Sequence, residues 1–203
     1  EQSTNDFTNN EGYMIYLQMQ DRTDSKVITF KDCTFSHLES NSKGGGGIGL
    51  LFDQLQNYLL EFKGCKFDHI TSTYPTIGGG AISIDVNCFN SYSNLYVEGC
   101  SFSDISSAAY GGSIFFNTPH SAIHLQNNRF TRSYAQMNGH SIHILNCKEK
   151  EIEISHCKFL DCGEIENSYS IMVNIENVNF LFNEVRFSDS SRSCGCIGCL
   201  KSG

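Results

Sequence analysis

The chain has 203 residues and a formal charge of −8, because 14 basic residues stand against 22 acidic ones. An acidic chain argues against a nucleic-acid backbone as the main partner, since phosphate binding requires a basic footprint. The hydrophobic fraction of 39% argues against wholesale disorder, and no apolar run approaches the roughly 20 residues that span a bilayer.

Three segments follow one another along the chain. We expect residues 1–10 to form a polar lead-in, residues 11–190 a repeat domain, and residues 191–203 a Cys-rich tail or the start of a following module. The chain begins with Glu1 rather than Met, so we expect a processed product or a piece of a longer protein. Neither end has the pattern of a cap, so either a larger protein continues the domain or a partner chain caps it end to end.

A Cys-x-Phe tripeptide marks the repeat. Full matches are Cys33/Phe35, Cys65/Phe67, Cys100/Phe102 and Cys157/Phe159, while Asn128/Phe130 and Val185/Phe187 keep the frame with a changed first residue. Upstream, the positions five and three residues before the Cys position are apolar in all six copies, and the residue between them varies. This alternation predicts a strand with one buried face. Gly64, Gly99 and Asn127 just before the Cys position indicate a bend.

A second strand is expected halfway round each repeat. Gly-rich starts lead into short β-type runs at 44–50, 78–84, 111–116 and 139–144, with weaker copies at 12–17 and 168–173. No segment shows sustained helical periodicity. A unit of about 30 residues cannot bury its own apolar face, and stacking of successive copies solves this problem. We therefore predict an all-β, right-handed parallel β-helix of about six coils of 28–35 residues, the handedness following from the rule for parallel crossovers.

The Gly79-Gly80-Ala81-Ile82 motif, echoed by Gly111-Gly112-Ser113-Ile114, resembles the GGAI repeats of the polymorphic membrane protein family. That family consists of surface adhesins with right-handed β-helical passengers, so the resemblance implies the same architecture and a surface role. The family pairs GGAI with Phe-x-x-Asn, whereas the phenylalanines of the Cys-x-Phe frame here lack Asn three residues on.

Two outward columns are candidate contact surfaces. On the Gly-rich strand, Phe115, His143 and Met172 follow one another and form a candidate binding surface, unless a turn or the rest of a longer chain covers them. A second outward column follows the Cys position and is basic in an otherwise acidic protein; its members are Thr34, Lys66, Ser101, Arg129, Lys158 and Arg186. We interpret this column as a solvated stripe, or alternatively as a contact for an anionic glycan.

A polar column lies four residues after the Cys position, and its members are His37, His69, Asp104, Arg132, Asp161 and Asp189. His37, His69 and Asp104 on three successive coils suggest a metal site. Asp104, Arg132 and Asp161 suggest an acid–base cluster. The simpler interpretation is a turn ladder in which Arg132 lies between the carboxylates of Asp104 and Asp161.

The ten cysteines divide into three groups. Cys33, Cys65, Cys100 and Cys157 share the phase of the apolar positions and are expected to be buried thiols, with disulfides between neighbours as the alternative. Asn128 takes the same position in another copy and is expected to hydrogen-bond a turn backbone. The remaining cysteines lie on turns (Cys88, Cys147 and Cys162) or in the tail, where Cys194, Cys196 and Cys199 predict a disulfide knot more readily than a zinc site.

An enzyme is the alternative interpretation. The segment 138–142 faintly resembles the Gly-His-Gly loop of polygalacturonases, without that family's paired aspartates. On the outer face of the first strand, Glu61 and Glu153 lie three coils apart, about 14 Å, which exceeds the range that glycoside chemistry uses.

For function, the sequence favours a non-enzymatic surface or structural module, outside the cell or on its surface. Such a module presents a rigid face to a protein or glycan partner for adhesion or assembly. The alternative is a β-helical polysaccharide lyase or glycoside hydrolase. We expect no catalytic residue, cofactor or metal, no nucleic-acid partner and no membrane span.

Overall fold

The computed structural model describes residues 6–8, 15–19, 26–41, 46–52, 58–76, 78–86, 93–117, 121–148, 151–163, 169–176, 178–188 and 195–201. These ranges contain twenty strands and no helix. Accordingly, no helix in the described part of the chain is long and apolar enough to cross a membrane.

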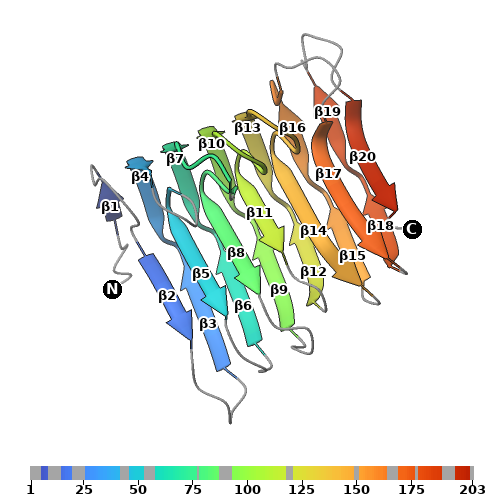
Figure 1. Cartoon of the computed structure of the whole chain (residues 1–203), viewed down its shortest axis with the longest axis horizontal. Coiled ribbons are helices and arrows are strands. Elements are labelled where there is room, and N and C mark those ends of the chain that lie inside the picture. The colour runs from blue at the N-terminus through green and yellow to red at the C-terminus, as the bar shows by residue number, and fades with distance from the viewer. Residues whose placement is uncertain are drawn as a thin grey trace.

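The strands form three sheets, each visited once per repeat (Figure 1). Sheet A contains β1 (Asp6–Thr8), β4 (Thr34–Ser40), β7 (Lys66–Ser72), β10 (Ser101–Ser107), β13 (Arg129–Ala135), β16 (Lys158–Leu160) and β19 (Arg186–Ser188). Sheet B contains β2 (Ile15–Met19), β5 (Ile48–Phe52), β8 (Ile82–Val86), β11 (Ile114–Asn117), β14 (Ile142–Lys148), β17 (Tyr169–Glu176) and β20 (Gly195–Lys201). Sheet C contains β3 (Lys26–Lys31), β6 (Tyr58–Lys63), β9 (Ser93–Glu98), β12 (Ser121–Gln126), β15 (Glu151–Ser155) and β18 (Asn179–Asn183).

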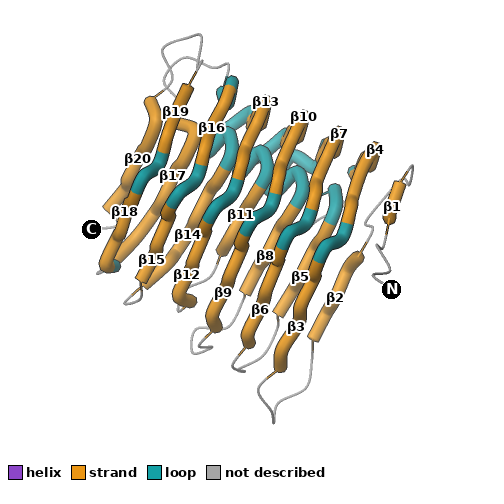
Figure 2. Tube along the Cα trace, turned by 180° about the vertical axis from the view of Figure 1, so that it is seen from behind, coloured by secondary structure: helices purple, strands orange, loops and turns teal. Residues whose placement is uncertain are grey.

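Every strand pairs in parallel with its counterpart one repeat away, so the predicted parallel β-solenoid is confirmed. The strand counts of seven, seven and six differ slightly from six uniform coils. Figure 2 shows the strands of each sheet lying side by side along the long axis of the molecule. Pairing also extends into both end segments, since Asp6 lies opposite Thr34 and Gly195 lies opposite Tyr169.

Like residues stack in the interior. The phenyl rings of the Cys-x-Phe frame form one continuous ladder, with centroids 5.0, 4.9, 4.8, 4.7 and 4.9 Å apart from Phe35 to Phe187. In sheet B the isoleucines of the Gly-rich strands lie in register, as in the pairing of Ile82 with Ile114 and of Ile114 with Ile142. The repeat frame read from the sequence is therefore the register of the sheets.

The cysteine frame is also inward. Cys33, Cys65, Cys100 and Cys157 are buried, and none of the described cysteines forms a disulfide. Each of the last three thiols lies at hydrogen-bond distance from a carbonyl oxygen of the preceding repeat; for Cys100 and Phe62 the Sγ–O distance is 3.5 Å. Burial raises the pKa of Cys157 to about 11 and that of Cys147 to about 12, so both thiols are protonated at neutral pH. Cys88 and Cys194 lie outside the described residues, as do the side chains of Cys196 and Cys199.

Asn128 makes the hydrogen bond that a thiol makes in other repeats, and it makes a second one as well. Its Nδ2 donates to the Val97 carbonyl at 2.7 Å, the position that thiols contact in other repeats, and its Oδ1 accepts from the Cys100 backbone N–H at 2.9 Å. The expected hydrogen bonding of this buried amide to the backbone is confirmed.

Two columns of left-handed residues bend the chain. One lies just before the Cys position, at the corner between sheets C and A, and comprises Asp32, Gly64, Gly99, Asn127, His156 and Glu184, with φ between 50° and 63°. The other comprises His37, His69, Asp104, Arg132 and Asp161, with φ between 50° and 56°. This second bend breaks the alternation of sheet A, so that Phe35 and Leu38, three residues apart, are both buried. Side chains at both bends point outward and provide the polar surface columns.

Candidate functional site

The outward column of sheet B is covered. Phe115, His143 and Met172 lie in register, yet their exposed fractions are only 5%, 6% and 4%. The structure agrees with the interpretation in which other parts of the chain cover this column. The Tyr110 ring lies against His143, with centroids 4.7 Å apart.

The Gly-rich turn provides much of this cover. Gly111 and Gly139 adopt φ of 61° and 66°, which an L side chain rarely adopts. A Cβ at Gly139 would lie 2.9 Å from the Cβ of His143, and one at Gly111 would lie 3.1 Å from the Cα of Phe115. Burial lowers the pKa of His143 to about 4, so its imidazole is neutral at physiological pH. A binding role for Phe115, His143 and Met172 therefore requires this turn to move.

The polar column of sheet A forms a ladder of paired groups. The His37 and His69 rings stack with centroids 5.1 Å apart. Arg132 donates from Nε and Nη2 to the two carboxylate oxygens of Asp104, at 2.5 and 2.6 Å. This pairing lowers the pKa of Asp104 to about 2. The expected neutralisation of a carboxylate by Arg132 is confirmed for Asp104.

The structure does not assemble the metal set suggested by the sequence. At this column, the potential ligand atoms that lie within 4.8 Å of one another belong to Asp68, His69 and Asp104, without His37. Both oxygens of Asp104 already accept from Arg132. A cation there would compete with a bidentate guanidinium, so the column is better described as a charge-neutralising ladder.

The outer face of sheet C separates Glu61 from Glu153 as predicted. Glu61 lies opposite Tyr96, Tyr96 opposite His124, and His124 opposite Glu153, which places the two carboxylates three strands apart.

The sequence reasoning missed Glu151, which lies two residues before Glu153 in the next outward column. The side-chain ligand atoms of His124, Glu151 and Glu153 lie within 4.8 Å of one another.

Glu153 lacks the raised pKa of a glycosidase acid. Glycoside hydrolysis requires one carboxylic acid that stays protonated because its pKa is raised. Burial acts to raise the pKa of Glu153, but hydrogen bonds from His124, Ser155 and Gln126 outweigh it and hold that pKa below its usual value. His124 Nδ1 lies 3.3 Å from one Glu153 oxygen, and Gln126 Nε2 donates to the other at 3.1 Å. Glu153 is thus an ionised hydrogen-bond acceptor.

His140, in the segment that resembles the polygalacturonase loop, is wholly buried. The Ala135 backbone N–H donates to its Nδ1 at 3.1 Å, and its ring lies near that of Tyr134, with centroids 5.5 Å apart. These contacts hold the turn between β13 and β14, and they leave the ring no access to a substrate.

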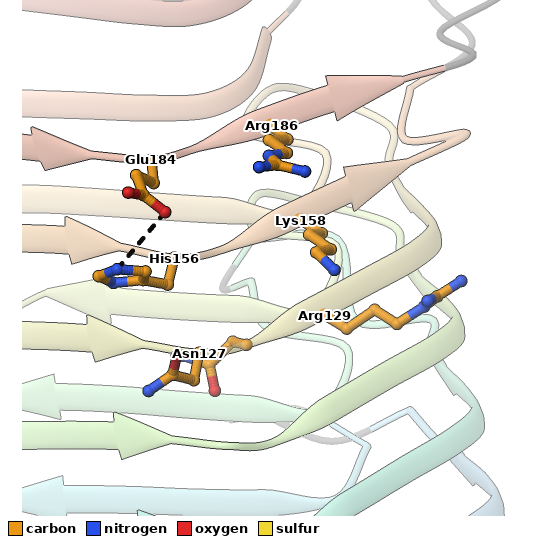
Figure 3. A pocket seen from close by; sticks show the side chains of 7 residues that line it. Asn127, Arg129, His156, Lys158, Glu184 and Arg186 are labelled. Atoms are coloured by element: carbon orange, nitrogen blue, oxygen red, sulfur yellow. Dashed lines mark ion pairs between the residues drawn. The ribbon is translucent and has the colours of Figure 1, made fainter.

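An open depression lies at the corner where sheet C passes into sheet A (Figure 3). It has a volume of about 400 Å³ and is lined by Asn127, Asn128, Arg129, His156, Lys158, Glu184 and Arg186. The left-handed bend before the Cys position supplies Asn127, His156 and Glu184 at one side. The first outward position of sheet A supplies the three cations at the other, and these lie in register on β13, β16 and β19.

The charge in this depression is unbalanced. Arg129, Lys158 and Arg186 are all exposed, and none forms an ion pair with a carboxylate among the described residues. Glu184, the carboxylate of the lining, lies 3.6 Å from His156 Nε2. The sequence predicted the basic column and a bend at Asn127, but it did not indicate that Asn127, His156 and Glu184 line one depression.

The depression can therefore hold an anion, through three cations in a row and polar groups along its edge. Comparison with protein-family models, with curated proteins and with solved structures gives no match for this chain.

Proposed function

We propose that this chain is a non-enzymatic structural module of a surface-exposed or extracellular protein, which presents a long rigid side for adhesion or assembly. The observation that carries the proposal is the continuous stacking of like residues through the three sheets. Each repeat is fixed by its neighbours, so the outer columns keep a constant spacing along the axis. A rigid array of this kind suits repeated contacts with an extended partner.

The chemistry of the outer face supports a non-catalytic role. Asp104 is neutralised by Arg132, Glu153 is ionised and hydrogen-bonded, and His140 is buried. None of these three groups is the accessible, protonated carboxylic acid that glycoside hydrolysis requires as its general acid.

The end of the solenoid at β18 supports a role in assembly. Inward-facing residues of the last level are partly exposed there, with exposed fractions of 36% for Phe182 and 39% for Ile197. Among the described strands, β18, β19 and β20 are the terminal strands of their sheets, and unpaired strand edges favour the addition of further strands. A further chain or segment with the same ladder pattern is the partner that suits this end.

The proposal is tested by two measurements on the full chain. Incubation with polygalacturonate, heparin and dextran, followed by sizing of the polysaccharides, is expected to leave their lengths unchanged. Shortened products would overturn the non-enzymatic role, and loss of cleavage in Glu153→Gln would then locate the site.

Sedimentation over a range of concentrations tests assembly. The wild type is expected to associate as concentration rises, and Phe182→Asp is expected to shift it toward the monomer. Met137→Asp is the matched control, because Met137 is 51% exposed but lies on the turn after β13. An unaltered monomer at all concentrations, or equal effects of the two variants, would contradict end-to-end assembly.

A further inference from the structure

We propose that the depression at the corner of sheets C and A is a binding site for an anionic polysaccharide, which lies along the solenoid axis across Arg129, Lys158 and Arg186. This inference rests on the proposed function, since it names the partner of the rigid side. It goes beyond that function by assigning a defined site and a ligand class.

The register of sheet A sets the spacing of the site. Arg129 is the direct partner of Lys158, and Lys158 that of Arg186. Neighbouring parallel strands are about 4.8 Å apart, so the three cations form a row with that period at their backbones. A linear polysaccharide in an extended form repeats its sugar rings at a comparable interval, so an acidic sugar polymer can place successive charges along the row.

Other cations on the outer surface, Lys63 and Arg132, are paired with carboxylates. Lys63 donates to Glu61 at 2.7 Å, and Arg132 makes its bidentate pair with Asp104. By contrast, the row in the depression stacks three like charges in a protein of net charge −8. Like charges directly opposite each other in a sheet are destabilising. The arrangement therefore costs stability in the free protein, and a polyanion that binds along the row removes that cost.

The lining matches the functional groups of an acidic sugar. Guanidinium groups bind carboxylate and sulfate oxygens through two parallel N–H bonds, and both arginines are exposed on the same side (Figure 3). On the corner side, Asn127, His156 and Glu184 offer donors and acceptors for sugar hydroxyls. Single-stranded nucleic acids are held largely by aromatic side chains on which bases stack, and the lining contains no Phe, Tyr or Trp.

The test measures binding of the full chain to heparin, which is sulfated, and to polygalacturonate, which is carboxylated, by titration calorimetry at low and physiological salt. Dextran and an oligothymidylate serve as the neutral-glycan and nucleic-acid arms. We expect binding to at least one acidic polysaccharide, weakening as salt rises, with no binding to dextran. Tighter binding to the oligothymidylate than to either acidic polysaccharide would overturn the assignment.

Two variants with equal charge change locate the site. The triple variant R129Q/K158Q/R186Q is expected to lose about tenfold in affinity, because it removes three exposed charge contacts. The matched control K31Q/K63Q/K66Q removes three cations from β3, β6 and β7, and it is expected to bind within about twofold of the wild type. Equal losses in the two variants would show that net charge rather than the depression governs binding, and would overturn the proposal.

Sizing the polysaccharides after each titration separates this inference from the proposed function. Intact polysaccharide with no binding contradicts the site but leaves the structural role standing. Shortened polysaccharide contradicts the non-enzymatic role, while the comparison of the two triple variants still decides whether the chain binds at the depression. A thermal unfolding curve of each variant ensures that a loss of binding is not a loss of fold.

Discussion

The inner and outer faces of sheet A are built on the same strands and the same parallel register. On the inner face, Phe102 lies between the rings of Phe67 and Phe130, and each ring gains contact area from identical neighbours. On the outer face, the same stacking places Lys158 between Arg129 and Arg186. A parallel in-register array thus amplifies whatever its columns contain, so that apolar columns stabilise the fold and unpaired charged columns oppose it. We therefore expect a partner to bind at unpaired charged columns.

The largest expected effect tests the inner face. Phe102→Ala removes a fully buried ring from the middle of the ladder, and we expect a loss of about 3–5 kcal/mol in the free energy of unfolding. Phe187→Ala is the matched control, because this ring ends the described ladder, stacks on Phe159 at 4.9 Å and is only partly buried. Urea unfolding measures both. Equal losses at the two positions would contradict the view that each ring depends on neighbours on both sides.

His143 shows that an outward position can become part of the interior. Its pKa is lowered by burial to about 4, whereas in the unfolded chain it is about 6.5. The unfolded state therefore binds more protons between these values, and stability falls as pH decreases from about 6.5 to 4, by about 3 kcal/mol in all.

Unfolding curves across this range, compared with those of His143→Met, measure the effect. Methionine occupies the adjacent position of the column at Met172, so it suits the site and is expected to abolish this part of the pH dependence. His37→Gln removes an exposed histidine and is expected to retain it. If His143→Met keeps the full pH dependence, the imidazole is not buried as described.

Asn128 tests the interior column of thiols. Asn128→Ala leaves the Val97 carbonyl and the Cys100 N–H without their partner, and we expect a loss of about 1–3 kcal/mol. Asn128→Cys restores a donor of the type that the other repeats use, so it is expected to recover part of this loss. Chemical denaturation compares the two, and a cysteine variant no more stable than the alanine variant would exclude a shared role for amide and thiol.

The repeat frame could be predicted because period-two alternation and a recurring Cys-x-Phe report directly on which side chains stack inward. Phe35, Phe102 and Phe159 therefore stack in the predicted register. The same alternation states only that Phe115 and His143 point away from the interior. It contains no information about a turn that folds back over them, which depends on the positive φ of Gly111 and Gly139.

One side of the candidate site could be predicted from the sequence. Its basic column has a fixed place in the repeat, so Arg129, Lys158 and Arg186 could be aligned from the sequence. Its other side comes from left-handed residues at a corner, and a backbone bend gathers them into a depression that residue spacing alone does not reveal. Glu151 could not be found from a single column of the repeat for a related reason, since it lies in the column next to the one that contains His124 and Glu153.

The smallest expected effect concerns the outer face of sheet A. Lys158→Gln removes the middle charge of the row, and in the absence of ligand we expect it to raise the free energy of unfolding by about 0.2–0.5 kcal/mol at low salt. The gain is expected to vanish in high salt, because screening removes the same repulsion from the wild type. Lys66→Gln is the control, since Lys66 lies in the same column between Thr34 and Ser101 and has no charged neighbour there. Thermal unfolding at two salt concentrations measures both. If Lys158→Gln stabilises the free protein and weakens polysaccharide binding, Lys158 is a residue retained for binding. If Lys158→Gln destabilises the protein at low salt, the row of cations has no repulsion for a ligand to relieve.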